Sequence, residues 1–162
     1  MSARWWRQQT PIGELLVVVD GGAITRIALP SAEACEPDAV PERDRGVAGA
    51  IDAWFGGDAR PLRDALVDLT SVRSPFRRRV LETLRRDVRW GETVTYGELA
   101  EMAGTPGAAR AVGTAMARNP VPLAVPCHRV VAWGGRIGGY GGGMHGVATK
   151  RALLALEGVH LT

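Results

Sequence analysis

The sequence has few of the residues that build metal centres and disulfide frameworks. Its 162 residues include two cysteines and three histidines, and none of these forms a C-x-x-C or H-x-x-x-H pair. Such pairs are typical of zinc sites, so we expect no bound metal. Cys35 and Cys127 could form a disulfide in an oxidising compartment. Because the sequence has no secretory signal, free thiols are the better interpretation.

Long hydrophobic runs are also missing. No uninterrupted apolar stretch approaches the roughly 20 residues of a membrane span, and the segment from Met1 to Arg7 has no apolar signal core. We therefore expect a soluble, cytoplasmic protein that does not bind a membrane. With 46% hydrophobic residues, the chain is long enough for one sizeable core or two small ones.

Lysine is nearly absent, and acidic residues are scarce in the second half. Residues 1–70 carry 7 Arg against 11 Asp and Glu, a net charge of −4, whereas residues 71–162 carry 12 Arg and 1 Lys against 6 acids, a net charge of +7. A compositional bias explains why arginine stands in place of lysine. It does not explain why the acidic residues are concentrated in the first half. Any surface that binds a polyanion is therefore expected in the second half.

The first half predicts a small sheet. Residues 14–19 and 23–29 are rich in β-forming residues and flank Asp20-Gly21-Gly22, a tight-turn signal, so we predict a hairpin. Residues 30–45 show no clean period and are expected to form a loop.

A helix is predicted next. Val47, Ile51, Trp54 and Phe55 fall on one helical face, and Gly56-Gly57 supplies a stop. Residues 65–69 could then form a further strand.

Composition changes near Thr70, where we place a domain boundary. Ser74-Pro75 combines an N-cap residue with proline at the first helical position, and residues 76–88 repeat apolar side chains at four-residue steps. We therefore predict an α+β protein. Residues 1–70 form a supporting sheet-plus-helix domain, and residues 71–162 form a mostly helical, winged-helix-like domain.

The second half contains a helix-turn-helix pattern. Residues 95–103 and 108–118 are predicted helices, and the four-residue turn between them contains glycine. Many such helical hairpins bind nothing, but the arginine-rich setting favours nucleic acid.

Cys127 follows this pattern in an apolar segment. Asn119-Pro120-Val121-Pro122 ends the second helix, and residues 123–131 are predicted to be buried and extended. A lone cysteine in such a segment is usually a core residue. However, His128 and Arg129 follow directly, and polar side chains in a buried segment need partners. Consecutive strand residues face opposite sides, so a water or a local turn would have to connect Cys127 with His128.

The segment Pro126-Cys127-His128-Arg129-Val130, preceded by Asn119-Pro120-Val121-Pro122 and Ala109-Arg110-Ala111-Val112-Gly113, resembles the O6-alkylguanine-DNA alkyltransferases, or methylated-DNA–protein-cysteine methyltransferases. The resemblance covers residues 76–158, and the N-terminal half matches only in its plan of strands and helices. It implies DNA repair by irreversible, single-turnover transfer of a methyl or larger alkyl group from guanine O6 in duplex DNA to Cys127. The base would be flipped out through the minor groove.

The same resemblance implies roles for individual residues. Cys127 is the nucleophile, and a thiol with a pKa of about 8.5 is only about 3% thiolate at pH 7, so it needs a base. In the family that base is His128 acting through water, with Glu157 orienting it and Tyr96 donating a proton to the leaving guanine. Further pocket and hinge positions are Asn119, Pro126, Val130, Tyr140 and Gly141. No cofactor is implied.

DNA contacts are also implied. Arg110 corresponds to the arginine that fills the gap left by the flipped base, and small residues early in the second helix permit close approach to the minor groove. The remaining positions are Arg77, Tyr96, Gly97, Thr105, Ala108, Ala109 and Trp133. The expected partner is double-stranded DNA carrying O6-alkylguanine, with O4-alkylthymine as a second candidate lesion, and the protein is expected to be a monomer.

Several alternatives stay open from residue type alone. Tyr96 could pack on the core, Asn119 could cap a helix, and Arg110 could bind any phosphate. A cysteine hydrolase would also use a Cys/His pair, but the sequence contains no oxyanion or elbow motif. A non-enzymatic DNA-binding module, such as a lesion sensor or a transcription regulator, would not need Cys127.

Overall fold

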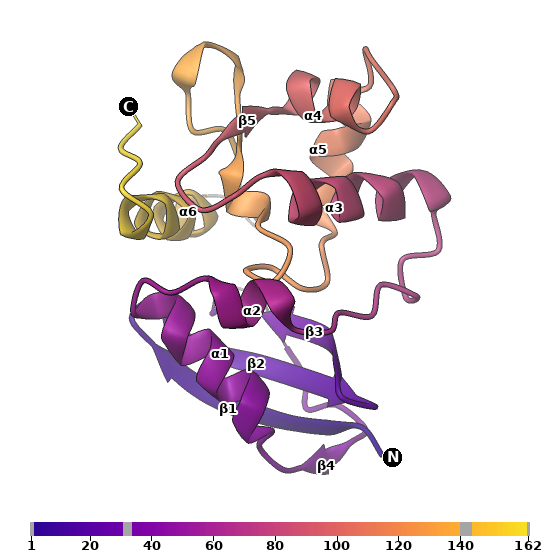
Figure 1. Cartoon of the computed structure of the whole chain (residues 1–162), viewed down its shortest axis with the longest axis vertical. Coiled ribbons are helices and arrows are strands. Elements are labelled where there is room, and N and C mark those ends of the chain that lie inside the picture. Colours follow the sequence, from indigo (N-terminus) through magenta and orange to yellow (C-terminus); the bar gives the residue numbers. More distant parts are fainter. Residues whose placement is uncertain (1, 31–33, 140–143, 162) are drawn as a thin grey trace. The chain divides into compact units, whose positions relative to one another are not determined.

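A computed structural model describes residues 2–30, 34–139 and 144–161 (Figure 1). The described residues form two compact units. The first comprises Met1–Ser71 and Pro120–Ala124, and the second comprises Val72–Asn119 and Val125–Thr162. Within the described ranges, no helix has the length and apolar character needed to cross a membrane.

Residues 120–124 belong to a different unit than predicted, because the predicted division placed them in the second domain. They belong to the first unit, where the backbone N–H of Ile27 donates to the carbonyl of Pro120 at 2.9 Å. Pro120, one of the prolines that end the preceding helix, therefore also supplies a carbonyl that accepts a hydrogen bond from a strand of the first unit.

The first unit contains a four-stranded sheet in the order β3-β2-β1-β4. The predicted hairpin is confirmed, because β2 (Gly13–Asp20) and β3 (Ala23–Ala28) pair antiparallel. The strand β1 (Arg4–Thr10), which pairs antiparallel with β2, was not predicted. The expected loop also contains the short strand β4 (Val40–Pro41), parallel to β1. Leu16, Val18 and Ala28 form one buried apolar cluster of this sheet.

The predicted helix of the first unit is confirmed as α1 (Arg45–Phe55). Asp44 caps its start, accepting a hydrogen bond from the N–H of Val47 at 3.0 Å, and Trp54 is buried. The short helix α2 (Arg60–Asp64) was not predicted. The expected strand over residues 65–69 is reduced to a single bridge between Val67 and Ile24.

The second unit is mostly helical, as predicted. Ser74 caps α3 (Pro75–Asp87), its hydroxyl accepting from the N–H of Arg77 at 3.2 Å. The predicted helix-turn-helix is confirmed as α4 (Tyr96–Met102) and α5 (Ala109–Ala117). A capping box at Thr95 and Glu98 begins α4.

The cysteine segment lies between α5 and the last helix, α6 (Met144–Leu156). Its predicted burial is confirmed, but its predicted extended form is wrong: Cys127–Arg129 form the 3-10 helix η1. The N–H of Cys127 donates to Val125 at 2.8 Å, and the N–H of Arg129 donates to Pro126 at 3.0 Å. These short-range bonds turn the chain before β6 (Val130–Val131), which pairs in parallel with β5 (Val94–Thr95).

Candidate active site around Cys127

Cys127 is a free thiol at the start of η1, only 3% exposed. In a strand, successive side chains point to opposite faces, but in a 3-10 helix they do not. Cys127 and His128 are therefore connected by a local turn, which an extended segment would lack. Tyr96 and Lys150 lie near enough for a charge on Cys127 to raise the pKa of each.

His128 and Glu157 form a buried pair. Nε2 of His128 lies 2.5 Å from Oε2 of Glu157, and both side chains are 0% exposed. Burial lowers the pKa of His128 by more than its contact with Glu157 raises it. Burial alone would raise the pKa of Glu157, but hydrogen bonds from His128 and Arg129 bring it below its ordinary value. At neutral pH the pair is therefore a carboxylate and a neutral imidazole.

This charge state determines the histidine tautomer. A carboxylate accepts hydrogen bonds only, so the ring proton lies on Nε2 and points at Glu157. Nδ1 then carries the lone pair and can act as a base.

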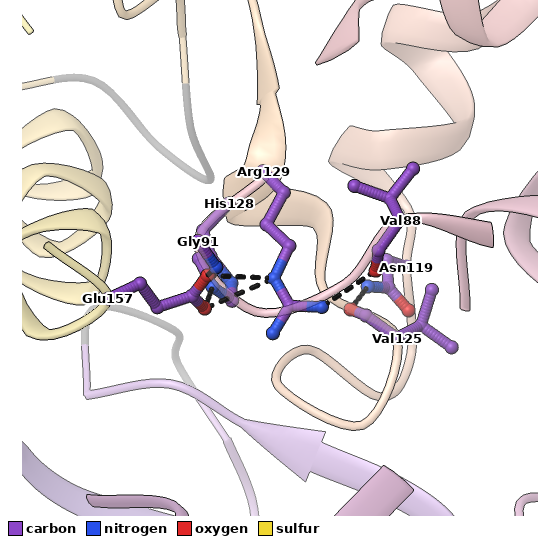
Figure 2. Close-up of polar contacts among 7 residues, drawn as sticks. All are labelled: Val88, Gly91, Asn119, Val125, His128, Arg129 and Glu157. Carbon is purple, nitrogen blue, oxygen red and sulfur yellow. Dashed lines mark hydrogen bonds and ion pairs between the residues drawn. The ribbon is translucent and has the colours of Figure 1, made fainter. Parts of the chain in front are cut away.

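Two further donors hold the Glu157 carboxylate (Figure 2). Nε of Arg129 donates to both oxygens, at 2.9 and 3.1 Å, and the N–H of Gly91 donates to Oε1 at 2.8 Å. The guanidinium of Arg129 also donates to the carbonyl of Val88 at 2.8 Å. The carboxylate that faces His128 is thus fixed in orientation, because side-chain and backbone donors bind both of its oxygens.

Asn119 links the end of the helix-turn-helix to the cysteine segment. Its amide Nδ2 donates to the carbonyl of Val125 at 2.9 Å, two residues before Cys127 (Figure 2). Pro126 and Val130, on either side of η1, are both buried. Tyr140 and Gly141, which were also predicted as pocket residues, lie outside the described residues.

Tyr96 stands at the first position of α4, half-buried. Its hydroxyl donates to the carbonyl of Gly139 at 3.4 Å. Burial raises its pKa, and a negative charge on Cys127 raises it further. The phenol therefore keeps its proton at neutral pH and can donate it.

The predicted DNA-contact residues all retain some exposure. Trp133, in the 3-10 helix η2 (Trp133–Gly135), is 87% exposed, and Arg110 is exposed near the start of α5. The others are partly exposed and lie on α3, α4, the turn and the start of α5: Arg77, Tyr96, Gly97, Thr105, Ala108 and Ala109.

Comparisons with known proteins converge on one family. Residues 75–159 match the family model "6-O-methylguanine DNA methyltransferase, DNA binding domain". The methylated-DNA–protein-cysteine methyltransferase of Mycobacterium bovis is 39% identical over 154 residues, covering 91% of this chain and 88% of the relative. The chain belongs to the O6-methylguanine-DNA methyltransferase family. The resemblance drawn from the cysteine segment is thereby confirmed.

Solved structures agree with this membership. Mycobacterium tuberculosis OGT, crystallised in complex with DNA, has a TM-score of 0.82 at 34% identity, covering 95% of this chain and 92% of that chain. The methyltransferase from Pyrococcus kodakaraensis has a TM-score of 0.68 at 29% identity and covers 97% of this chain and 99% of its own. The family likeness therefore extends over both units, including the N-terminal half that resembled it only in plan.

Two contributors to the site were not predicted. Arg129 was identified only as a polar residue in need of a partner, and a buried arginine two positions after Cys127 is itself a signal for a buried carboxylate. Gly91 contributes through its backbone N–H, and no side-chain pattern could have identified it.

Proposed function

We propose that this methyltransferase repairs duplex DNA by moving a methyl or larger alkyl group from O6 of guanine to the sulfur of Cys127. The observation that carries the proposal is the buried His128–Glu157 pair beside Cys127, inside the family's DNA-binding domain. A neutral imidazole with its proton directed at a carboxylate is the arrangement that a general base for a thiol requires.

In the first step, Nδ1 of His128 takes the proton of the Cys127 thiol through a water molecule. The imidazolium that results is stabilised by the Glu157 carboxylate at 2.5 Å. The thiolate then attacks the alkyl carbon, so that an S–C bond forms and the C–O6 bond breaks.

The electron pair of the broken bond stays on guanine, which takes a proton from the phenol of Tyr96. The proton held by His128 restores the phenol through solvent. The product on the protein is a thioether. The other cysteine, Cys35, is exposed and in the other unit, and we propose no route that regenerates the thiol. One molecule therefore repairs one lesion.

For DNA, we propose docking of the helix-turn-helix in the minor groove. Ala108 and Ala109 at the start of α5 are too small to read base edges, but they allow the backbone to approach closely. Arg110 would enter the stack when the target nucleotide is rotated out, and Trp133 would contact the flanking backbone. Flipping costs a few kcal/mol, less for a badly paired alkylated base, which favours lesions.

We further propose that the protein acts as a monomer in the cytoplasm, where a free thiol such as Cys127 stays reduced. The first unit would then serve as structural support. O4-alkylthymine is a second candidate substrate, since it presents an alkyl group on a comparable exocyclic oxygen.

The test is to incubate the protein with duplex DNA that contains one O6-methylguanine and to weigh the intact protein. We expect a gain of one methyl group, mapped to Cys127 and absent in Cys127→Ala. A lesion sensor would bind the DNA without gaining mass. A hydrolase or other multiple-turnover enzyme would process more lesions than there are protein molecules, and either result would contradict the proposal.

A further inference from the structure

Trp133, at the start of η2, is a strongly exposed tryptophan. It is 87% exposed, and the next of the exposed large apolar residues in the described ranges, Leu66, reaches 67%. The other four tryptophans of the chain are buried or partly buried: Trp5, Trp6, Trp54 and Trp90. Tryptophan is highly buried on average, because the indole is large and mostly apolar, and it is enriched where proteins bind partners. The exposed indole is therefore a candidate for contact with a binding partner.

Trp133 belongs to a short loop that runs from Ala132 to Arg136. The N–H of Ala132 donates to the carbonyl of Arg136 at 2.9 Å, which closes the loop. Gly134 and Gly135 adopt positive φ, +79° and +77°, and let the chain turn tightly between these ends. Because the backbone of the loop is closed by its own hydrogen bond, the indole keeps a defined place without being buried.

The base of the Trp133 loop packs against Tyr96. A Cβ atom on Gly138 would lie 3.3 Å from both the N atom of Ala132 and the hydroxyl of Tyr96. The chain that enters the loop, the chain that leaves it and the phenol are thus in close packing. The exposed indole therefore stands on a loop that begins beside the proposed proton donor.

The chemistry of an indole fits a nucleobase better than a phosphate. An indole has one N–H donor and no charge, so it offers a phosphate a single neutral hydrogen bond. Residues 71–162 already contain 12 arginines, including the exposed Arg136 of the same loop, and a guanidinium suits phosphate well. An aromatic face, in contrast, can stack on any of the four bases. The partner that matches Trp133 is therefore the face of a base.

A base face becomes available when the target nucleotide is rotated out of the duplex. The rotation ends the stacking of the target on its neighbours. Proteins that bind the minor groove also insert apolar side chains between base steps and partly unstack them. In the proposed function the leaving base meets the phenol of Tyr96, and the Trp133 loop is packed on that phenol. The nucleotides next to the target are therefore the ones within reach of the indole.

We propose that Trp133 stacks on a base next to the flipped nucleotide in the lesion strand and so stabilises the flipped state. This inference rests on the proposed transfer from DNA. Arg110 would fill the gap that the flipped base leaves, and Trp133 would cover a neighbouring base in addition to its contact with the flanking backbone. Since every base has a π-face, this contact adds affinity with little sequence preference.

The first test places 2-aminopurine, a fluorescent base that is quenched when an indole stacks on it, directly 5′ or directly 3′ of O6-methylguanine in a duplex. Cys127→Ala protein is used, so that the lesion is not consumed. At one of the two positions, we expect fluorescence in the complex to be about twofold lower, or less, than with protein that also carries Trp133→Ala. Equal fluorescence with the two proteins at both positions would overturn the proposal.

The second test measures the Kd of Cys127→Ala protein for the methylated duplex by fluorescence anisotropy at several salt concentrations. We expect Trp133→Ala to raise the Kd by about tenfold and to leave the slope of log Kd against log salt unchanged, because a neutral ring releases no counterions. Trp133→Phe keeps an aromatic face and should stay within about threefold. The matched control, Arg136→Ala, removes an exposed charged side chain from the same loop, so any loss of affinity should come with a shallower slope.

Three results of the second test would contradict stacking: an unchanged Kd in Trp133→Ala, equal losses in Trp133→Ala and Trp133→Phe, or a shallower salt slope in Trp133→Ala. Thermal melts of the variants should match the parent, since the side chain is exposed. If Trp133→Ala does not fold, acrylamide quenching of the parent decides. Trp133 is the most exposed of the five tryptophans, and methylated duplex should protect it from the quencher.

The proposed function fails separately from this inference. Wild-type protein that takes no methyl group from DNA refutes the proposed function. Wild-type transfer, together with 2-aminopurine fluorescence that does not depend on Trp133, refutes only the stacking contact.

Discussion

Arg129 binds Glu157 in the interior of the second unit, its Nε donating to both carboxylate oxygens at 2.9 and 3.1 Å. The two side chains are 8% and 0% exposed. Removing one partner of such a pair leaves a buried charge without compensation, which is strongly destabilising.

We therefore predict that Arg129→Met lowers the free energy of unfolding by about 3 kcal/mol or more. The control is Arg86→Met, which breaks the exposed contact between Arg86 and Asp87, with side chains 69% and 39% exposed. That change should leave stability almost unchanged, because an ion pair between exposed side chains contributes little. Urea unfolding of the three proteins measures the difference, and equal losses in both variants would contradict the role given to burial.

Glu157→Gln tests the charge of the carboxylate rather than its shape. The amide keeps the size of the side chain but can no longer stabilise an imidazolium on His128, so thiol activation should suffer. We expect the single-turnover rate constant for methyl transfer to fall by about 100-fold, which is the lower end of the range of rate losses for removal of a general base. DNA binding, measured by fluorescence anisotropy with unmodified duplex, should stay within about twofold, since Glu157 is buried. An unchanged transfer rate would exclude His128–Glu157 as the activating pair.

The buried pair also makes stability depend on pH. The folded-state pKa of His128 lies below its unfolded value, so the unfolded chain takes up the proton first, and stability falls as the pH drops below about 6.5. The depressed pKa of Glu157 adds stability that is lost at still lower pH, as the folded carboxylate becomes protonated.

Urea titrations between pH 8 and pH 4 would show this decline. His128→Gln should flatten the first part of it, whereas His160→Gln, at an exposed histidine, should follow the wild type. The prediction is wrong if stability is constant from pH 7 to pH 5.

Arg110→Ala tests the proposed flipping of the base. The side chain is exposed near the start of α5, so its loss should leave the fold and the chemistry of Cys127 intact. We expect repair of duplex DNA to slow by about tenfold, the cost of losing roughly 1.4 kcal/mol at the gap in the stack. Reaction with the free base O6-benzylguanine should be unchanged.

Arg118→Ala is the matched control, since Arg118 is exposed at the other end of the same helix. Slower reaction of Arg110→Ala with the free base as well would point to a role in the pocket rather than in the duplex.

Sequence reasoning succeeded where the signals are local. The N-cap and proline at Ser74-Pro75, the turn at Asp20-Gly21-Gly22 and the glycine-containing turn before α5 each depend on a few adjacent residues, and each is present. The strand β1 was missed because its two tryptophans are adjacent rather than alternating, and because Gln8, although buried, is a polar residue. Gln8 donates its hydrogen bonds to Ala48 and Asp52, far along the chain, and no local pattern contains these contacts.

The site was predictable in its residue types but not in its backbone. Valines and leucines around Cys127 favour a strand, and only the actual bonds from Cys127 to Val125 and from Arg129 to Pro126 reveal the 3-10 turn. The hydrogen bond from Gly91 to Glu157 joins positions 66 residues apart, and its donor is a main-chain N–H that every residue but proline possesses. A contact between positions so far apart depends on tertiary packing, which composition and spacing do not reveal.

Gly138 offers a test of the packing beneath Tyr96. It adopts φ +75°, and a Cβ atom would lie 3.3 Å from both the N atom of Ala132 and the hydroxyl of Tyr96. Gly134 adopts a similar φ of +79°, but a Cβ atom there would meet no atom of the described residues within 4 Å, its chain neighbours aside. Gly134→Ala therefore carries the same backbone strain without the collision. Each alanine should cost about 1–2 kcal/mol from the left-handed conformation.

Only Gly138→Ala should also displace the phenol. We expect it to slow methyl transfer by about tenfold relative to Gly134→Ala, because a misplaced donor of this kind costs more in rate than in stability. Single-turnover rates together with thermal melts separate the two effects. If both variants lose the same stability and transfer at the same rate, the position of Tyr96 does not depend on Gly138, and the prediction is wrong.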